Sequence, residues 1–305
     1  MTTILDRRPI LVAVGDSDVH ESGLRFAAAE TLRDDRPLHL AHVIHAPQGV
    51  IGQDNLLIRL RDAEQAGRTL LDAQASRAGN LTRGRVPVRT FLRRGSVVPE
   101  LVELSRGADH VVLQHRQLGR GSRVFTGTVA AGLAASAPVP VVSIPELWSG
   151  RTTPLEVSAG LDGRHDDEVL ERAFMEADMR GASLTLVHAW FLPALYDDAA
   201  LERHALHQWR DELQQKLLDE AAPWRPLYPD VELRIEIPHV RPADALVEVA
   251  RRSDLLLLGH RPSRDTEQVG AITRAVLREA GCPTEVVTHH RTSADYGSLR
   301  LAAAK

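Results

Sequence analysis

The two halves of this 305-residue chain are similar in sequence, and this similarity limits the possible folds more than any other feature. The segment 108–116, ADHVVLQHR, resembles the segment 253–261, SDLLLLGHR. His42 ends an apolar stretch that recurs before His188, 146 residues later. A spacing that drifts so little predicts two copies of one domain rather than a solenoid of short repeats.

A stretch that contains proline, glycine and serine, around residues 145–154, predicts the boundary between the copies. Each domain then has about 150 residues, which is a common domain size. We expect a first domain at residues 1–147, a linker at 148–153, a second domain at 154–290 and a C-terminal tail at 291–305.

Short apolar runs alternate with amphipathic stretches in both halves, which is typical of an α/β fold. The uninterrupted runs Val111–Leu113 and Leu255–Leu258 suit strands that are covered on both faces, as in parallel sheets. We therefore predict two tandem, doubly wound, Rossmann-like domains, each with a five-stranded and mainly parallel sheet.

The pattern places the elements of the two copies in the same order. The expected strands are Ile10–Val14, Leu38–Ile44, Val86–Leu92, Asp109–Leu113 and Val139–Ile144, then Leu155–Ala159, Ser183–Ala189, Val231–Ile237, Asp254–Leu258 and Glu285–Thr288. The expected helices are Gly23–Thr31, Asp54–Arg77, Val97–Arg106 and Thr128–Ser136, then Glu168–Met179, Asp198–Glu220, Ala243–Arg251 and Ala271–Ala280.

Composition excludes several classes of function. A net charge of −4 and an aromatic content of 4% argue against nucleic acid as a partner. The single cysteine, Cys282, excludes an internal disulfide and a multi-cysteine zinc site, and lysine occurs only at Lys216 and Lys305, so the P-loop lysine is missing. No apolar run is long enough for a membrane span, and Ile10–Val14 is too short for a signal peptide. We expect a cytoplasmic protein with no membrane partner.

The order of the elements predicts where a ligand binds. In doubly wound folds, ligands bind beyond the carboxyl ends of the strands, where the direction of winding reverses. The loops expected there are 15–22 and 114–127 in the first half and 160–167 and 259–270 in the second. The longer loop of each half carries glycine and arginine and leads into a helix, whose first N–H groups suit a phosphate.

Both halves resemble the universal stress protein family, over residues 8–145 and 152–288. In that family the first strand ends in Val-Asp-Gly-Ser. The fourth strand leads into Gly-x2-Gly-x9-Gly-(Ser/Thr), which holds the phosphates of ATP. The resemblance implies that the last strands pair, here Val139–Ile144 with Glu285–Thr288, so that the halves form an intramolecular pseudo-dimer. A homodimer of the whole chain stays open in addition.

The second half retains more of the family's nucleotide motif. Asp162 and Gly163 match the family's aspartate and its glycine, and Gly259 matches the first glycine of the phosphate motif. Pro262 stands at the second glycine and lacks an N–H donor, and Ala271 stands where a hydroxyl is expected.

The first half retains less. The position of the family's aspartate falls on Gly15, next to Asp16. In the phosphate motif, Gln114 and Gln117 replace the first two glycines, and only the Gly-Thr pair at 127–128 matches. A lost hydrogen bond weakens binding by about 0.5–1.5 kcal/mol, or about 1.5–3 kcal/mol for a charged acceptor. Several losses together lower affinity about 100-fold or more. We expect weak or absent binding of ATP, with Mg²⁺, in both halves, and the second half as the better site.

The resemblance implies a non-catalytic stress-response or signalling module that binds an adenine nucleotide. Two alternatives stay open: a slow nucleotide hydrolase in which Asp162 positions a cation, and a protein-interaction scaffold with both crevices closed. No nucleophile–base motif or metal-ligand cluster is present in the sequence, so no catalytic residue or metal site is predicted. The candidate nucleotide contacts are Asp162, Gly163, Ala189, Gly259, His260, Arg261, Gly270 and Ala271, and in the first half Asp16, Val43, His115, Arg116, Gly127 and Thr128.

Overall fold

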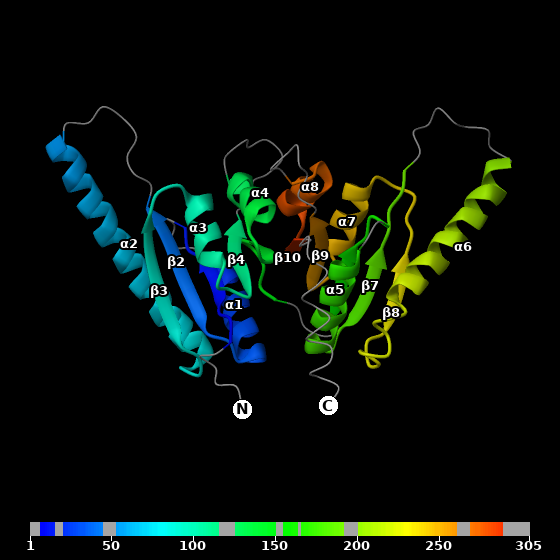
Figure 1. Cartoon of the computed structure of the whole chain (residues 1–305), viewed down its shortest axis with the longest axis horizontal. Coiled ribbons are helices and arrows are strands. Elements are labelled where there is room, and N and C mark those ends of the chain that lie inside the picture. The colour runs from blue at the N-terminus through cyan, green and yellow to red at the C-terminus, as the bar shows by residue number, and fades with distance from the viewer. Residues whose placement is uncertain are drawn as a thin grey trace.

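The structure is a computed structural model. Figure 1 shows one sheet running through the molecule, with helices on both of its faces. The structure describes residues 7–15, 21–44, 53–115, 126–150, 155–163, 166–191, 201–260 and 269–288, with backbone only at 53–57, 126–128 and 201–207.

Each half has the predicted order of alternating strands and helices. The first half contains β1 (Ile10–Ala13), α1 (Glu21–Asp34), β2 (Leu38–Ile44), α2 (Gln53–Thr82), β3 (Val88–Arg94), α3 (Val97–Ser105), β4 (His110–His115), α4 (Thr126–Ser136) and β5 (Val141–Pro145). The second half contains β6 (Glu156–Gly160), α5 (Asp167–Arg180), β7 (Ser183–Val187), α6 (Leu201–Ala221), β8 (Leu233–Glu236), α7 (Pro242–Ala250), β9 (Leu255–His260), α8 (Ala271–Glu279) and β10 (Thr284–Thr288).

The strands form one ten-stranded sheet in the order β3-β2-β1-β4-β5-β10-β9-β6-β7-β8. All pairings within a half are parallel, and the halves meet through the antiparallel pair β5 and β10, where Thr284 lies opposite Ser143. Each last strand therefore covers the edge of the other. The α/β fold of two doubly wound halves and the pairing of their last strands are confirmed.

Burial on both faces explains the uninterrupted apolar run in β9. Leu255 and Leu257 pack in the cluster shared with α1, α2, α5 and α6. Leu256 and Leu258 pack on the opposite face, with α7 and α8. Because successive residues of a strand point to opposite faces, a strand with two covered faces needs an apolar residue at every position.

Buried charged side chains also join the halves. Arg180 of α5 contacts Glu30 of α1 at 2.9 Å, and both side chains are only 5% exposed. Within the second half, Arg172 of α5 pairs at 2.7 Å with Glu285 of β10, the strand that meets the first half. Burial alone would raise the pKa of Glu30, but Arg180 and Arg33 outweigh burial and leave this pKa below its ordinary value. Removing Arg180 would therefore leave Glu30 buried with less compensation of its charge, although Arg33 stays at 2.7 Å.

The strand predicted at Ser183–Ala189 ends earlier, at Val187. Its neighbour β8 ends at Glu236, and Pro238 follows shortly afterwards with no N–H to donate to the ladder. Pairing then resumes as an isolated bridge between Trp190 and His239. Ala189 therefore lies beyond the strand in which it was predicted.

The helix predicted at Asp54–Arg77 is longer in the structure and continues to Thr82. It ends where Arg83 and Gly84 adopt positive φ angles of 53° and 66°. The glycine at position 79 lies inside this helix, so it does not act as the stop signal that glycine often provides.

Candidate functional site

The loops predicted to hold a ligand follow the central strands of each half. β1 lies between β2 and β4, and β6 lies between β7 and β9, with parallel pairing throughout. The chain therefore leaves these strands at one edge of the sheet in each half. This edge is the switch point at which ligands of doubly wound folds bind.

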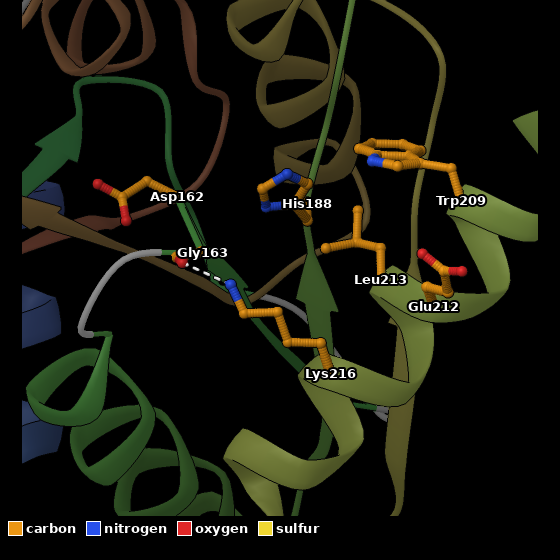
Figure 2. Close-up of a pocket in the computed structure, with 7 residues that line it drawn as sticks. All are labelled: Asp162, Gly163, His188, Trp209, Glu212, Leu213 and Lys216. Atoms are coloured by element: carbon orange, nitrogen blue, oxygen red, sulfur yellow. Dashed lines mark hydrogen bonds between the residues drawn. The ribbon is translucent and has the colours of Figure 1, made fainter.

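A cavity of about 340 Å³ opens at this edge in the second half, and we call it the α6 cavity. Figure 2 shows its walls, which come from the turn after β6, the residue after β7 and one face of α6. The α6 residues share a face because three or four positions separate them along the helix. The lining residues are Asp162, Gly163, His188, Trp209, Glu212, Leu213 and Lys216.

The turn after β6 depends on two glycines. A Cβ at Gly160 would come within 2.7 Å of the Leu246 side chain, so glycine lets β6 and α7 pack closely. Gly163 has a φ of +74°, which strains any residue with a side chain. Its N–H donates to the Asp166 carboxylate at 2.8 Å and closes the turn before α5. This turn presents the exposed Asp162 at the edge of the cavity.

Lys216 connects α6 to this turn. Its ammonium donates to the Gly163 carbonyl at 2.9 Å, as the dashed line in Figure 2 marks, and lies 3.7 Å from the Glu220 carboxylate. Burial, with the nearby charge of Asp162, raises the pKa of Asp166 above its ordinary value. Among the described side chains around this turn, carboxylates therefore outnumber ammonium groups.

His188 lies between Asp162 and Trp209 in the view of Figure 2. Burial lowers the pKa of His188 below its ordinary value, so the ring is neutral at pH 7. The ring hydrogen-bonds the backbone of Leu161, while its Nδ1 is buried without a partner among the described residues.

Aromatic rings support the far wall of the cavity. The Trp209 ring is held edge-on by Trp190, with centroids 4.7 Å apart and an interplanar angle of 62°. Trp190 in turn stacks on His239, with centroids 3.9 Å apart and an angle of 12°. Trp209 nevertheless remains 39% exposed, so this supported ring keeps surface available for a ligand.

Comparison with known proteins identifies the family. The model of the Universal stress protein family matches residues 6–145 and 159–288, which is most of both halves. The chain belongs to the universal stress protein family. It is 31% identical over 297 residues to a universal stress protein of Mycolicibacterium smegmatis, covering 91% of this chain and 96% of that relative. A universal stress protein of Mycobacterium tuberculosis H37Rv is 32% identical over 231 residues, which cover 73% of this chain and 70% of the relative.

A solved structure supports the fold of this universal stress protein. The crystal structure of a universal stress protein from Archaeoglobus fulgidus DSM 4304 aligns with a TM-score of 0.65 over 92% of this chain and 98% of that one. The sequence identity is 14%, so this likeness concerns the fold alone.

Two of the predicted contacts of the second half, Asp162 and Gly163, come together at the α6 cavity. Gly259 and His260 end β9, and Gly270 lies directly before α8. The α6 cavity is not lined by the other described candidates of this half, which are Ala189, Gly259, His260, Gly270 and Ala271.

In the first half, Gln114 of β4 occupies the place that Gly259 of β9 has in the second half. Its Oε1 accepts hydrogen bonds from the Ser22 hydroxyl at 2.8 Å and from the Gly23 N–H at 3.1 Å. Both donors lie in the first turn of α1, where backbone N–H groups lack partners within the helix. The glutamine that replaces the family's glycine therefore caps α1 with its own side chain.

Two further candidates of the first half are buried in the protein. Val43 is 7% exposed and packs in the apolar cluster beneath α3 and α4. His115 is 5% exposed, and its Nδ1 lies 2.8 Å from the Ser143 hydroxyl. Burial lowers the pKa of His115 to about 4, so the ring is neutral at pH 7.

For the remaining candidates, the structure describes no side chains. Asp16, Arg116 and Arg261 lie outside the described residues. Gly127 and Thr128 lie in the first turn of α4, where only the backbone is described.

Sequence reasoning missed most of the cavity wall. The missed residues are His188, Trp209, Glu212, Leu213 and Lys216. The available signal was the spacing of the α6 residues, which places a tryptophan, a leucine and a lysine on one helical face. Nothing in that spacing indicates that this face lies opposite the turn after β6.

The described residues contain neither a metal-ligand cluster nor a membrane-spanning helix. No three His, Cys, Asp or Glu side chains within the described ranges come together as metal ligands would. Among the described helices, none combines the length and the hydropathy of a membrane-spanning segment.

Proposed function

We propose that this universal stress protein is a non-catalytic stress-response module that binds one adenine nucleotide weakly, in its second half. The observation that carries the proposal is the position of Asp162. This residue matches the family's aspartate and lies at the edge of a 340 Å³ cavity at the switch point of the fold. Such a cavity is within the range of roughly 300–1,000 Å³ that is common for small-molecule sites.

The turn after β6 and the start of α8 would hold different parts of the ligand. Asp162 would accept hydrogen bonds from the ribose hydroxyls, as an acidic residue does in other doubly wound folds. Gly270 and the first N–H groups of α8 would face the phosphates of ATP and its Mg²⁺. Ala271 offers no hydroxyl there, which is one reason to expect weak binding.

The first half would serve as a structural partner. Gln114 already occupies the donors at the start of α1, which favours a crevice closed to ligands. We keep the division into domains at 1–147 and 154–290 as part of this proposal. Trp148, the first residue of the proposed linker, packs against Phe26 of the first half, with ring centroids 5.5 Å apart.

Calorimetric titration with ATP and Mg²⁺ tests the proposal. Asp162→Asn removes a charged acceptor and should weaken binding by about 1.5–3 kcal/mol, or about 10- to 150-fold. Asp230→Asn, at an exposed aspartate that does not line the cavity, should bind like the unmodified chain. Binding that Asp162→Asn leaves unchanged would contradict the proposal.

A coupled ATPase assay on the same proteins distinguishes binding from slow hydrolysis. The proposal predicts no turnover above background in either the unmodified chain or Asp162→Asn. Turnover that depends on Asp162 would replace the binding module with a hydrolase.

A further inference from the structure

We infer that this chain associates head-to-tail with a second copy of itself, through the oppositely charged outer ends of its two halves. We call the chain from α2 to β3, residues 53–94, the basic end, and the chain from α6 to β8, residues 201–236, the acidic end. Figure 1 shows these elements at the two extremes of the longest axis of the molecule. The inference is independent of the proposed nucleotide site.

Equivalent stretches of the two halves carry opposite net charge. Residues 45–94, from the end of β2 to the end of β3, contain nine basic and four acidic residues, a net charge of +5. Residues 188–236, from the end of β7 to the end of β8, contain five basic and ten acidic residues, a net charge of −5. When both stretches are extended through the next helix, to residues 106 and 252, the net charges are +4 and −4. The opposite signs therefore do not depend on where the stretches are cut.

Most of these charged side chains lie on the surface. Every arginine of the basic end is exposed: Arg59, Arg61, Arg68, Arg77, Arg83, Arg85, Arg89, Arg93 and Arg94. The exposed carboxylates among the described side chains of the acidic end are Asp211, Glu212, Asp219, Asp230 and Glu232. The two surfaces are therefore available to a partner and attract each other.

Ion pairs within each end do not remove this surplus. Arg94 pairs with Glu64 on the basic end, and Arg234 pairs with Glu232 at 2.9 Å on the acidic end. Each such pair is neutral, so it leaves the net charge of its end unchanged. A guanidinium can donate two parallel hydrogen bonds to one carboxylate, so a surface rich in arginine fits a surface rich in carboxylates.

The sheet also ends at these two places. Among the described strands, β3 pairs only with β2 and β8 only with β7, so each has one edge without a neighbouring strand. Charged side chains keep such edges apart when the facing edges carry the same sign. This protection acts between two basic ends or two acidic ends, but it fails between a basic end and an acidic end. A symmetric end-to-end dimer brings like ends together and is disfavoured, whereas head-to-tail contact is favoured.

Sedimentation velocity of the whole chain tests the inference. At about 0.01 M salt, where charges act over about 30 Å, the average mass should rise with concentration above that of a single chain and pass that of a dimer, because head-to-tail contact can be repeated from copy to copy. At about 1 M salt, where charges act over about 3 Å, the chain should be monomeric. A chain that stays monomeric in dilute salt at its highest soluble concentration would overturn the inference and leave the two ends to other partners. Association that is equally strong in both salts would overturn it as well.

Charge reversal at one end at a time identifies the surfaces. The basic-end variant combines Arg68→Glu, Arg89→Glu and Arg93→Glu, and the acidic-end variant combines Asp211→Arg and Asp219→Arg. In dilute salt, each variant alone should need at least about tenfold more protein to associate than the unmodified chain does, because its two ends no longer attract each other. The matched control has the same net charge as the basic-end variant but should still associate, since its three reversals lie on α1 and α8: Arg25→Glu, Arg274→Glu and Arg278→Glu.

A mixture of the two variants gives the most specific result. The basic-end variant keeps the acidic end, and the acidic-end variant keeps the basic end. An equimolar mixture in dilute salt should therefore form a one-to-one complex at concentrations at which each variant alone is monomeric. A mixture that stays monomeric, with both variants folded by circular dichroism, would overturn the inference. Variants that each associate as readily as the unmodified chain would overturn it too, because another surface would then make the contact.

Discussion

The two halves share one architecture but differ at the edge of the sheet where ligands bind. In the first half, Gln114 at the end of β4 extends to α1 and caps it. In the second half, Gly259 stands at the matching place in β9, and α5 follows a turn closed by its own Asp166. The start of α1 is therefore covered by a side chain from a distant strand, whereas the turn before α5 is closed by a residue of its own.

The long helices differ in a related way. Leu71 of α2 and Leu217 of α6 are both buried at equivalent places, which aligns Gly67 with Leu213. A Cβ at Gly67 would come within 2.8 Å of Leu92 and 3.0 Å of His42, so α2 lies directly on β2 and β3. In the second half a leucine stands at that position, and the α6 cavity opens beside it. The glycine at this position in α2 thus allows the helix to pack closely on the sheet, whereas the leucine at the same position in α6 lines a cavity.

The largest expected effect comes from the junction that the two halves share. Arg180→Ala leaves Glu30 buried without its partner from the other half, and should lower the free energy of unfolding by about 3–5 kcal/mol. Urea denaturation measures this loss. Arg25→Ala removes an exposed pair with Glu21 and should cost less than about 1 kcal/mol. Similar small losses in both variants would show that the halves do not depend on the buried pair.

A second effect tests the burial of His115 in the first half through the response of stability to acid. The pKa of His115 in the folded protein is lowered to about 4 by burial, so the unfolded chain takes up a proton first. Above pH 6.5 the neutral ring makes its full contribution to the free energy of unfolding. As the pH falls from 6.5 toward 4, this contribution is lost, about 3 kcal/mol in total. His115→Gln should flatten this part of the stability curve, as urea denaturation at several pH values would show. An unchanged curve would mean that His115 does not titrate as its burial predicts.

A third effect compares two glycines of the second half that share a positive φ. Gly163→Ala and Gly181→Ala introduce the same backbone strain, at φ values of 74° and 59°, and each should cost roughly 1–2 kcal/mol of stability. Only Gly163 faces the cavity, where a new Cβ would lie 3.3 Å from the His188 ring. Only Gly163→Ala should therefore also weaken nucleotide binding in calorimetry. Equal nucleotide affinities in the two variants would show that the turn at Gly163 does not contribute to binding.

The smallest effect tests how closely α2 packs in the first half. Gly79→Ala meets no atom within 4 Å and should stabilise α2 by about 0.5–1 kcal/mol. Gly67→Ala has the same gain in helix propensity but brings a Cβ against Leu92 and His42, so thermal unfolding should show little or no gain. An equal gain in both variants would mean that α2 has room to move and that the first crevice is not closed by packing.

The sequence was sufficient to predict the fold because strands that are buried on both faces appear as uninterrupted apolar runs. Runs such as Leu255–Leu258 have no polar position, and the order of elements around them permits few topologies. The pairing of β5 with β10 came instead from the family resemblance. The early end of β7 was missed because it depends on Pro238, which follows the neighbouring strand β8 and lies about 50 residues away in the sequence.

The site was predictable only in part. Asp162 and Gly163 were found because a motif next to a strand is local in sequence. Trp209 and Lys216 were missed because their role depends on which face of α6 lies opposite the turn after β6, and this follows from packing between distant segments. The role of Gln114 was visible as a departure from the family's pattern, but its hydrogen bonds to the start of α1 required coordinates.

The central claim is that only the second half accepts a nucleotide, and a crystal soaked with AMP or ATP tests it most directly. The account predicts density for a base and ribose between Asp162 and Trp209, with Gln114 still bonded to Ser22 and Gly23 in the first half. Nucleotide density at the first half, or a displaced Gln114 with a ligand against α1, would contradict it.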